Sequence, residues 1–508
     1  MAPGAYMLDF AVFKPPEEWR VDFERSWSNG PYWRDFIQER SEFLEKVNAK
    51  SGLHPNGTFL PPAVNPAMSK DYTIDMKTAM TEAELVMGGS VAEVLEKSGI
   101  KAEEVDILIT NCSIFCPTPS LASMLINKFK FRQDIEAYHL GGMGCSIGVV
   151  AVGLVRDMLK AHPNSIALFV PCEVTTYCYY PGTNKDFVVS NAIFRSGGAA
   201  MLMTNKPSLY SRCKYELHSS TRVHTGQDDS AYKCISWGPD EEGINGVYLS
   251  KDVPIQAGAM LERVISAATP KIMTWGQYAE AAVNVVGRKY LGREWPRYVP
   301  DYTKCMDHFA LHAGGYAVLK GIQKGMNLPM EMMLPSFASL RDFGNTSSST
   351  TWYSIAYMER FGMVKTGQRI MQVGAGGGMK GGVNIWTALR DTVDHHKAWM
   401  HAKVAYTEKD MPRSILNPHE ERDLVGKENR KRAVAAATAS KAKVAATRGS
   451  SSKPAKVFDI SVNAGGKSAA AAAPSGCSTR ARKPQSAIAM AIEAEALAEQ
   501  NELGVAAL

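Results

Sequence analysis

The sequence lacks a long uncharged apolar run at its N-terminus, where Asp9, Lys14 and Glu17 arrive early. This absence argues against a secretory signal and against a membrane-spanning helix in that segment. The one internal window without charge, residues 137–155, contains five glycines, one histidine and a Cys-Ser pair near its middle. This composition predicts a turn that leads into a buried helix, and not a helix that crosses a bilayer.

Long blocks of one charge are also lacking over the first four hundred residues. The chain carries a net charge of +6, and residues 426–508 hold 13 Lys/Arg against 6 Asp/Glu, which leaves −1 for the remainder. A positive charge confined to a tail does not indicate a nucleic-acid-binding body. We therefore expect no nucleic-acid partner.

Cysteines are few, and their number of nine is odd. They are scattered along the chain, and no pair recurs at zinc-finger spacing. This pattern predicts reduced thiols in an intracellular compartment or on a face open to the cytosol. It also gives no reason to expect a metal site.

Composition divides the chain into a long α/β region and a tail. Up to residue 395, short β-rich runs alternate with helix-like segments. Residues 396–508 are rich in Ala, Lys and Ser and are predicted to be mostly disordered, apart from a short helix at 486–500. We interpret this tail as a solvated appendage, with a basic segment that rests on anionic lipid as the alternative.

The α/β region shows a weak internal repeat. Residues 144–146 open a helix after a glycine-rich turn, and residues 344–347 do much the same two hundred residues later. Such a repeat predicts two similar α/β halves, residues 1–210 and 211–395, with reactive groups at their seam. The clearest strands are expected at residues 106–110, 166–170, 199–204, 369–373 and 383–388.

Cys145 is the first candidate for chemistry, because it follows a run of glycines and precedes an apolar helix. The pattern places it in the first turn of a helix that ends by His162, where the helix dipole would favour a thiolate. The alternative is a small residue that fills a tight core. Gly148 and Gly153, inside the same helix, predict a neighbour packed closely against it.

A histidine pair and an asparagine are the other candidates. His308 and His312 are four residues apart, and His312 stands before a second glycine-flanked helix. Asn345 precedes a run of Thr and Ser, which is also typical of a helix N-cap. An asparagine amide directed into a site would supply an uncharged donor to a developing enolate oxygen.

Several motifs resemble, in order and spacing, the plant and algal 3-ketoacyl-CoA synthases, over residues 5 to 392. These motifs are residues 111–113, 117–120, 141–146, 312–315 and 344–349. The resemblance implies an α/β, thiolase-like fold with two pseudo-symmetric halves in an α-β-α-β-α arrangement. Two departures are that the family's N-terminal membrane-spanning pair is missing and that Arg341 stands where the family usually has a histidine.

The resemblance also assigns roles to residues. It implies a catalytic triad of Cys145, His312 and Asn345, with His224 and His308 as supporting residues. The glycine run at 376–381 matches a dinucleotide fingerprint, but no βαβ unit follows it. The resemblance implies instead that Gly377, together with the Cys145 N–H, forms an oxyanion hole.

The activity implied by the resemblance is the condensation of a long-chain acyl-CoA with malonyl-CoA through an acyl-cysteine, without a metal or other cofactor. The family further implies a homodimer, partnership with ketoacyl reductase, dehydratase and enoyl reductase, and the cytosolic face of the endoplasmic reticulum membrane. Cytoplasmic location is the alternative, because the membrane pair is missing. The alternative functions are a type III polyketide synthase and a non-catalytic subunit of an elongase complex.

Overall fold

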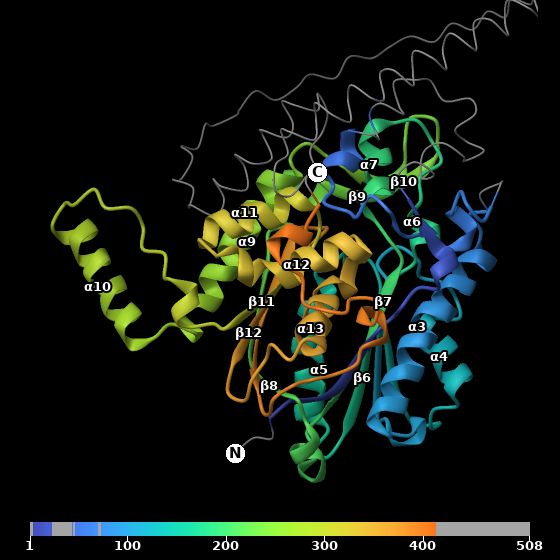
Figure 1. Ribbon diagram of the computed structural model, residues 1–508, viewed down its shortest axis with the longest axis horizontal. Coiled ribbons are helices and arrows are strands. Elements are labelled where there is room, and N and C mark those ends of the chain that lie inside the picture. The colour runs from blue at the N-terminus through green and yellow to red at the C-terminus, as the bar shows by residue number, and fades with distance from the viewer. Residues whose placement is uncertain (1–3, 23–42, 44–45, 70–72, 413–508) are drawn as a thin grey trace, which may run out of the picture. The chain divides into compact units, whose positions relative to one another are not determined.

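The computed structural model describes residues 4–22, 43, 46–69 and 73–412 of the chain (Figure 1). Nine strands of these residues form one sheet, which consists of two groups. The first group runs in the spatial order β1 (Tyr6–Val12), β7 (Gly197–Thr204), β6 (Ile166–Glu173), β4 (Ile107–Asn111) and β5 (Glu136–Leu140). The second runs in the order β8 (Tyr215–His224), β13 (Lys380–Ala388), β12 (Arg369–Gly376) and β11 (His308–Leu311).

The two groups repeat one topology. In each, the first strand of the chain lies beside the last strand, and the last lies antiparallel to the one before it. A parallel pair follows in both, β6 with β4 and β12 with β11. The groups meet where β1 pairs with β8 over Tyr6↔Glu216 and Met7↔Tyr215. The weak sequence repeat therefore corresponds to a structural repeat.

Two helices lie between the strand groups. Helix α5 (Ile147–Ala161) contacts β6 of the first group and β12 and β13 of the second, while α13 (Thr350–Arg360) contacts β1 and β11. The outer helices are α3 (Met76–Ser98) and α4 (Leu121–Phe129) on one side, and α9 (Val253–Ala268), α11 (Tyr316–Met326) and α12 (Met330–Phe343) on the other (Figure 1). This confirms the predicted layers of helices and strands.

The remaining strands and α-helices of the described residues are β2 (Arg20–Val21), β3 (Thr58–Phe59), β9 (Ile235–Pro239), β10 (Asn245–Leu249), α6 (Thr175–Cys178), α7 (Lys185–Ile193), α8 (Asp229–Lys233) and α10 (Trp275–Tyr290). Apolar side chains pack into two large clusters, one around each strand group. Strand β6 is buried along its whole length, as expected of a strand covered on both faces.

The five expected strands are all present, and most extend beyond the predicted ends. Helix α5 ends at Ala161, as Pro163 required, but it begins at Ile147. Cys145 therefore lies in the turn before the helix, and its predicted place in the first helical turn is wrong. The predicted close neighbour exists, because a Cβ on Gly148 would stand 1.7 Å from the Ser348 carbonyl oxygen.

The uncharged window at residues 137–155 divides into β5, a turn and α5. Among the described residues, no helix combines the length and the apolar character needed to cross a bilayer.

The folded region extends past the predicted boundary at residue 395. Trp399 is fully buried, and its indole N–H donates to the Tyr353 carbonyl at 2.9 Å. Residues 396–412 therefore belong to the folded body, because a buried indole anchors them to α13. The rest of the predicted tail, including the helix expected at 486–500, lies outside the described residues.

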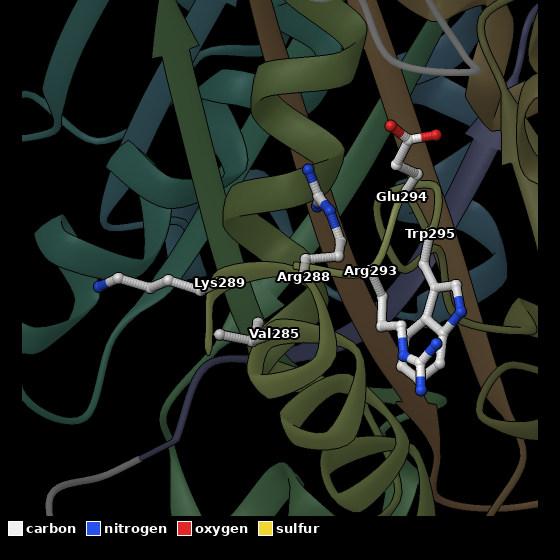
Figure 2. Close-up of a pocket in the computed structure, with 6 residues that line it drawn as sticks. All are labelled: Val285, Arg288, Lys289, Arg293, Glu294 and Trp295. Atoms are coloured by element: carbon white, nitrogen blue, oxygen red, sulfur yellow. The ribbon is translucent and has the colours of Figure 1, made fainter. Parts of the chain in front are cut away.

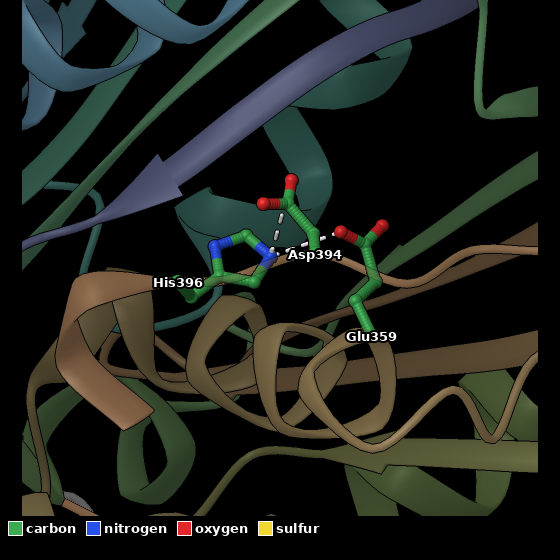
Figure 3. Close-up of side chains that lie close together, drawn as sticks. All are labelled: Glu359, Asp394 and His396. Atoms are coloured by element: carbon green, nitrogen blue, oxygen red, sulfur yellow. Dashed lines mark hydrogen bonds and ion pairs between the residues drawn. The ribbon is translucent and has the colours of Figure 1, made fainter. Parts of the chain in front are cut away.

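A buried ion cluster joins the ends of the chain's folded part. The Lys214 ammonium lies 2.7 Å from Asp9 of β1 and 2.8 Å from Glu359 of α13, and His396 lies 2.9 Å from Glu359. Figure 3 shows Asp394 beside the same imidazole. Burial opposes ionisation of Glu359, but Lys214 and His396 together outweigh it and lower the pKa of Glu359 to about 2. Because Lys214 supplies the positive charge among Asp9, Glu359, Asp394 and His396, we interpret this cluster as a structural ion network.

Candidate active site

Cys145 lies in a glycine turn between β5 and α5. Gly142 and Gly144 both have positive φ angles, of 64° and 68°, which glycine adopts without strain. A Cβ on Gly144 would stand 2.6 Å from the Gly377 nitrogen, and one on Gly376 would stand 2.7 Å from the Cys145 nitrogen. The backbone of the β12–β13 hairpin therefore packs directly on the cysteine turn.

The Cys145 sulfur is part of a hydrogen-bonded chain. The Ser347 hydroxyl lies 3.3 Å from Cys145 Sγ and 3.1 Å from Glu173 Oε2. Glu173 also accepts from the backbone nitrogens of Ser113 and Ile114, both at 3.1 Å. Ser347 adopts a φ of 53°, a conformation that costs energy for a residue other than glycine and that concentrates at functional sites.

Burial decides the protonation of the cysteine. It raises the pKa of Cys145 to about 11, while the Ser347 hydroxyl acts in the opposite direction. Burial also raises the pKa of Glu173, the carboxylic residue that accepts a hydrogen bond from Ser347. Cys145 is therefore a thiol at neutral pH, and the thiolate expected from the helix dipole is not the resting state.

Asn345 is fixed beside this chain through its backbone and its side chain. Its backbone nitrogen donates to the Ile193 carbonyl at 3.0 Å, and its Oδ1 accepts from the Ser347 nitrogen at 2.8 Å. Its Nδ2 donates to the Gly314 carbonyl at 3.2 Å. Because a carboxamide nitrogen carries two hydrogens, a second N–H is left for another acceptor.

His312 directly follows β11. Gly314 lies between His312 and the Asn345 side chain. A Cβ on Gly314 would stand 3.0 Å from His312 Nε2, so the glycine backbone packs against the imidazole. Only 6% of His312 is exposed, and burial lowers its pKa to about 4. The imidazole is therefore neutral at physiological pH. Through Ser347 and Gly314, the structure brings Cys145, Asn345 and His312 into one cluster.

The other two predicted histidines lie outside this cluster. His308 begins β11, four residues or about 13 Å of extended chain from His312, and its Nε2 lies 3.0 Å from Gln368 Oε1. His224 ends β8 with an exposed side chain, opposite Lys380 in the neighbouring strand. The structure thus places His224 near the rim of the site and His308 at the far end of its strand.

Sequence reasoning missed three residues of the site. Ser347 belonged to a run interpreted as helix caps, and Glu173 stood unnoticed at the end of an apolar strand. Lys380 lies in β13, and its ammonium donates to the Met143 carbonyl at 2.9 Å, beside the cysteine turn. An acidic residue at the carboxyl end of a buried strand was the one available signal, because such ends commonly line sites in α/β folds.

Arg341 is directed away from the cluster. Its guanidinium lies over the Tyr406 ring, 4.6 Å from the ring centre, and its Nε donates to the Asp410 carbonyl at 3.0 Å. It therefore anchors residues 406–410 to α12.

Comparison with known proteins gives two family matches. Residues 2–290 match the family described as FAE1/Type III polyketide synthase-like protein, and residues 303–388 match the C-terminal part of 3-oxoacyl-[acyl-carrier-protein] synthase III. Among curated proteins, 3-ketoacyl-CoA synthase 5 of Arabidopsis thaliana is 37% identical, covering 76% of this chain and 77% of the relative. 3-Ketoacyl-CoA synthase 17 of the same plant is 37% identical over 80% of this chain and 82% of its own length.

Solved structures with the same fold include two type III polyketide synthases. The C-terminal domain of Steely1 from Dictyostelium has a TM-score of 0.61 at 16% identity, covering 76% of this chain and 99% of that domain. The 1,3,6,8-tetrahydroxynaphthalene synthase of Streptomyces coelicolor has a TM-score of 0.59 at 17% identity, covering 75% and 99%. At these identities the likeness establishes the fold.

Proposed function

The chain belongs to the family of 3-ketoacyl-CoA synthases, and we propose that Cys145, His312 and Asn345 carry out its reaction. The protein is a condensing acyltransferase of fatty acid elongation. It joins a long-chain acyl-CoA to malonyl-CoA and yields a 3-oxoacyl-CoA two carbons longer, with release of CO₂ and CoA. The observation that carries the assignment of residues is the cluster itself, in which Ser347 connects Cys145 with Asn345 and Gly314 connects Asn345 with His312.

In the first half of the reaction, Cys145 takes the acyl group from acyl-CoA. Its sulfur attacks the thioester carbonyl, and the bond between that carbonyl and the CoA sulfur breaks. Since Cys145 is a thiol at neutral pH, its proton has to leave during the attack, and neutral His312 is the base that we assign to this step. The CoA thiolate then takes the proton as it departs.

In the second half, malonyl-CoA loses CO₂ and becomes a thioester enolate. His312 and the second N–H of Asn345 hydrogen-bond the enolate oxygen, and each such preorganised donor contributes on the order of a hundredfold in rate. The enolate carbon attacks the acyl-cysteine carbonyl, a carbon–carbon bond forms, and the bond to Cys145 breaks. The N–H groups of Cys145 and Gly377 hold the oxygen of that intermediate, a role supported by the packing of Gly377 against Gly144. The released Cys145 thiolate then takes a proton from solvent and returns to the thiol.

Decarboxylation supplies the nucleophilic carbon, so we propose that no metal or redox cofactor takes part. The 3-oxo group of the product has to be reduced, dehydrated and reduced again before another round of elongation. We therefore propose that a ketoacyl reductase, a dehydratase and an enoyl reductase consume the product. A homodimer at the cytosolic face of the endoplasmic reticulum membrane is the assembly that we propose from the family.

Product analysis tests this function and separates it from that of a type III polyketide synthase. Incubation with a long-chain acyl-CoA and malonyl-CoA should give one product, longer by a single two-carbon unit. Several successive extensions followed by cyclisation would instead establish a polyketide synthase, which the fold also accommodates. Cys145→Ser should abolish product, whereas Cys213→Ser, at a buried cysteine before β8, should retain it. If the protein is folded but cannot be labelled at Cys145 by a thiol reagent or an acyl-CoA, it is a non-catalytic subunit.

A further inference from the structure

A helical arm extends from the second half of the molecule. It consists of α10 and the segment 291–301 that returns beside it, and Figure 1 shows it standing apart from the layers. Within α10, Gln277 and Gly287 are the buried residues, and most of the others are exposed. A helix this exposed is stabilised by what it binds or by its own arm, and not by the core.

The polar face of α10 is covered by the return segment. Gln277 donates to the Asp301 carbonyl at 2.7 Å, Asn284 donates to the Pro296 carbonyl at 3.0 Å, and Glu280 accepts from the Tyr298 hydroxyl at 2.7 Å. Gly287 packs against the Trp295 ring, since a Cβ there would stand 2.2 Å from it. These four helix positions share one face, so the amphipathic helix turns its polar side inward.

The outward face of α10 is apolar and aromatic. Trp275 is 89% exposed and Tyr290 70%, and helical spacing places Tyr278 and Val286 on the same side. Val283, which is 62% exposed, lies at the edge of this face. Of the twenty large apolar side chains that are exposed among the described residues, nine belong to residues 275–299. Exposed apolar side chains gathered in this way mark a contact surface, whereas scattered ones do not.

Cations gather at one end of the arm. Residues 275–301 contain four Lys/Arg and three Asp/Glu, and three of the four cations lie between residues 288 and 293. Near the end of α10, Arg288 and Lys289 of the helix and Arg293 of the return segment line an open hollow together with Glu294 and Trp295 (Figure 2). Cations therefore lie next to the aromatic and apolar side chains of the arm.

We propose that this arm docks on a lipid bilayer that contains anionic lipid, with α10 lying in the interfacial plane. Trp and Tyr side chains favour the level of the headgroups, and Lys and Arg bind anionic headgroups. A helix with an apolar face and basic flanks binds in this way. The proposal does not depend on which reaction the enzyme performs.

Vesicle flotation of the full chain tests the apolar face. The probes are vesicles of phosphatidylcholine alone and of phosphatidylcholine with about one third phosphatidylserine. The variant Trp275→Ser/Val286→Ser/Tyr290→Ser should bind the anionic vesicles on the order of tenfold more weakly or worse, because three exposed apolar side chains no longer enter the bilayer. The control Tyr232→Ser/Met400→Ser/Val404→Ser removes apolar side chains that are exposed elsewhere and should bind as the parent does.

The basic residues are tested in the same assay. Arg288→Gln/Lys289→Gln/Arg293→Gln should lose about fivefold in affinity per charge on anionic vesicles and little on neutral ones. The control is Lys160→Gln/Lys233→Gln/Lys304→Gln, at lysines that are exposed outside the arm.

Three outcomes would overturn the proposal. The first is that the parent protein does not bind anionic vesicles. The second is that both arm variants bind as the parent does, which would place the contact outside the arm. The third is that the apolar-face variant binds vesicles as before but no longer forms a dimer in light scattering without vesicles, which would make the arm a contact between two copies of the chain. Turnover measured in vesicle-free buffer, with acyl-CoA below its micellar concentration, reports on the proposed reaction separately.

Discussion

At the scale of single residues, the site is organised around a half-buried, protonated thiol and not around a preformed thiolate. Loss of solvent raises the pKa of Cys145, and the Ser347 hydroxyl opposes this. A protonated thiol is a weak nucleophile. The reactive thiolate of Cys145 therefore forms only when a thioester is bound and a base removes the proton from the thiol.

The pH dependence of alkylation follows from this thiol. With a pKa of about 11 for Cys145, the thiolate fraction rises about tenfold per pH unit over the whole range from pH 7 to pH 10. Alkylation of Cys145 by iodoacetamide, followed by peptide mass spectrometry, should rise by the same factor without a plateau. A plateau near pH 7 would show a thiolate in the resting enzyme and would contradict the structure.

Ser347 is expected to position the sulfur and to favour its ionisation. Ser347→Ala removes the hydroxyl that lies between Cys145 and Glu173. We expect acylation of Cys145 to slow by roughly tenfold, the equivalent of one hydrogen bond to a charged group, and alkylation to need a higher pH. Ser354→Ala is the matched control, because the buried Ser354 hydroxyl in α13 has no hydrogen-bond partner. If both variants acylate at the parent rate, Ser347 has no such role.

At the scale of elements, close packing of glycines brings the two halves of the site together. Helix α5 approaches the segment that follows Asn345, and the β12–β13 hairpin approaches the turn before α5. Each contact leaves no space for a side chain. The position of Ser347 beside Cys145 therefore depends on backbone packing between elements two hundred residues apart.

Gly148→Ala tests this packing. The added methyl would stand 1.7 Å from the Ser348 carbonyl, so we expect unfolding stability to fall by about 1–3 kcal/mol and acylation of Cys145 to slow. Gly276→Ala in α10 is the same substitution where the nearest atom is 3.9 Å away, and there the change should stabilise the helix by up to about 1 kcal/mol. Urea unfolding midpoints measure both. Equal effects of the two substitutions would show that the α5 contact is not tight.

The elements were predictable from the sequence to the extent that local patterns determine them. The apolar run at 166–170 and the β-rich run at 369–373 indicated strands, and the spacing of Val149, Val152 and Val155 indicated α5. The contact of Ser347 with Cys145 and Glu173 was not predictable, because it joins residues far apart in the chain. Burial of the sulfur, which sets its pKa, is likewise a property of the whole fold.

At the scale of the whole molecule, the buried ion cluster ties the start of the fold to its end. Lys214 connects β1, α13 and the segment after β13, and residues up to Trp399 pack beside it. An ion pair of this kind is costly to break, since one charge is then left buried and unpaired. This explains why the folded body continues past the predicted boundary at residue 395.

Lys214→Met should destabilise the protein by about 3–5 kcal/mol, because Glu359 and Asp9 lose their buried partner. In acid, the unsubstituted protein should lose the stability that the ion pair between Glu359 and Lys214 contributes. The pKa of Glu359 is lowered in the folded state, so its stabilisation is present above the unfolded pKa of about 4.5 and is lost as pH falls toward about 2. Thermal unfolding across this range measures both effects. Lys365→Met, at an exposed ion pair, should change stability by less than about 1 kcal/mol. If Lys214→Met is as stable as that control, the cluster is not structural.

The acyl-cysteine mechanism is tested by intact-protein and peptide mass spectrometry after incubation with a long-chain acyl-CoA, first alone and then with malonyl-CoA. We predict that the acyl mass appears on Cys145 and is then discharged as a 3-oxoacyl-CoA two carbons longer. Absence of acylation at Cys145 in the folded protein, with every chain length tried, would contradict the account.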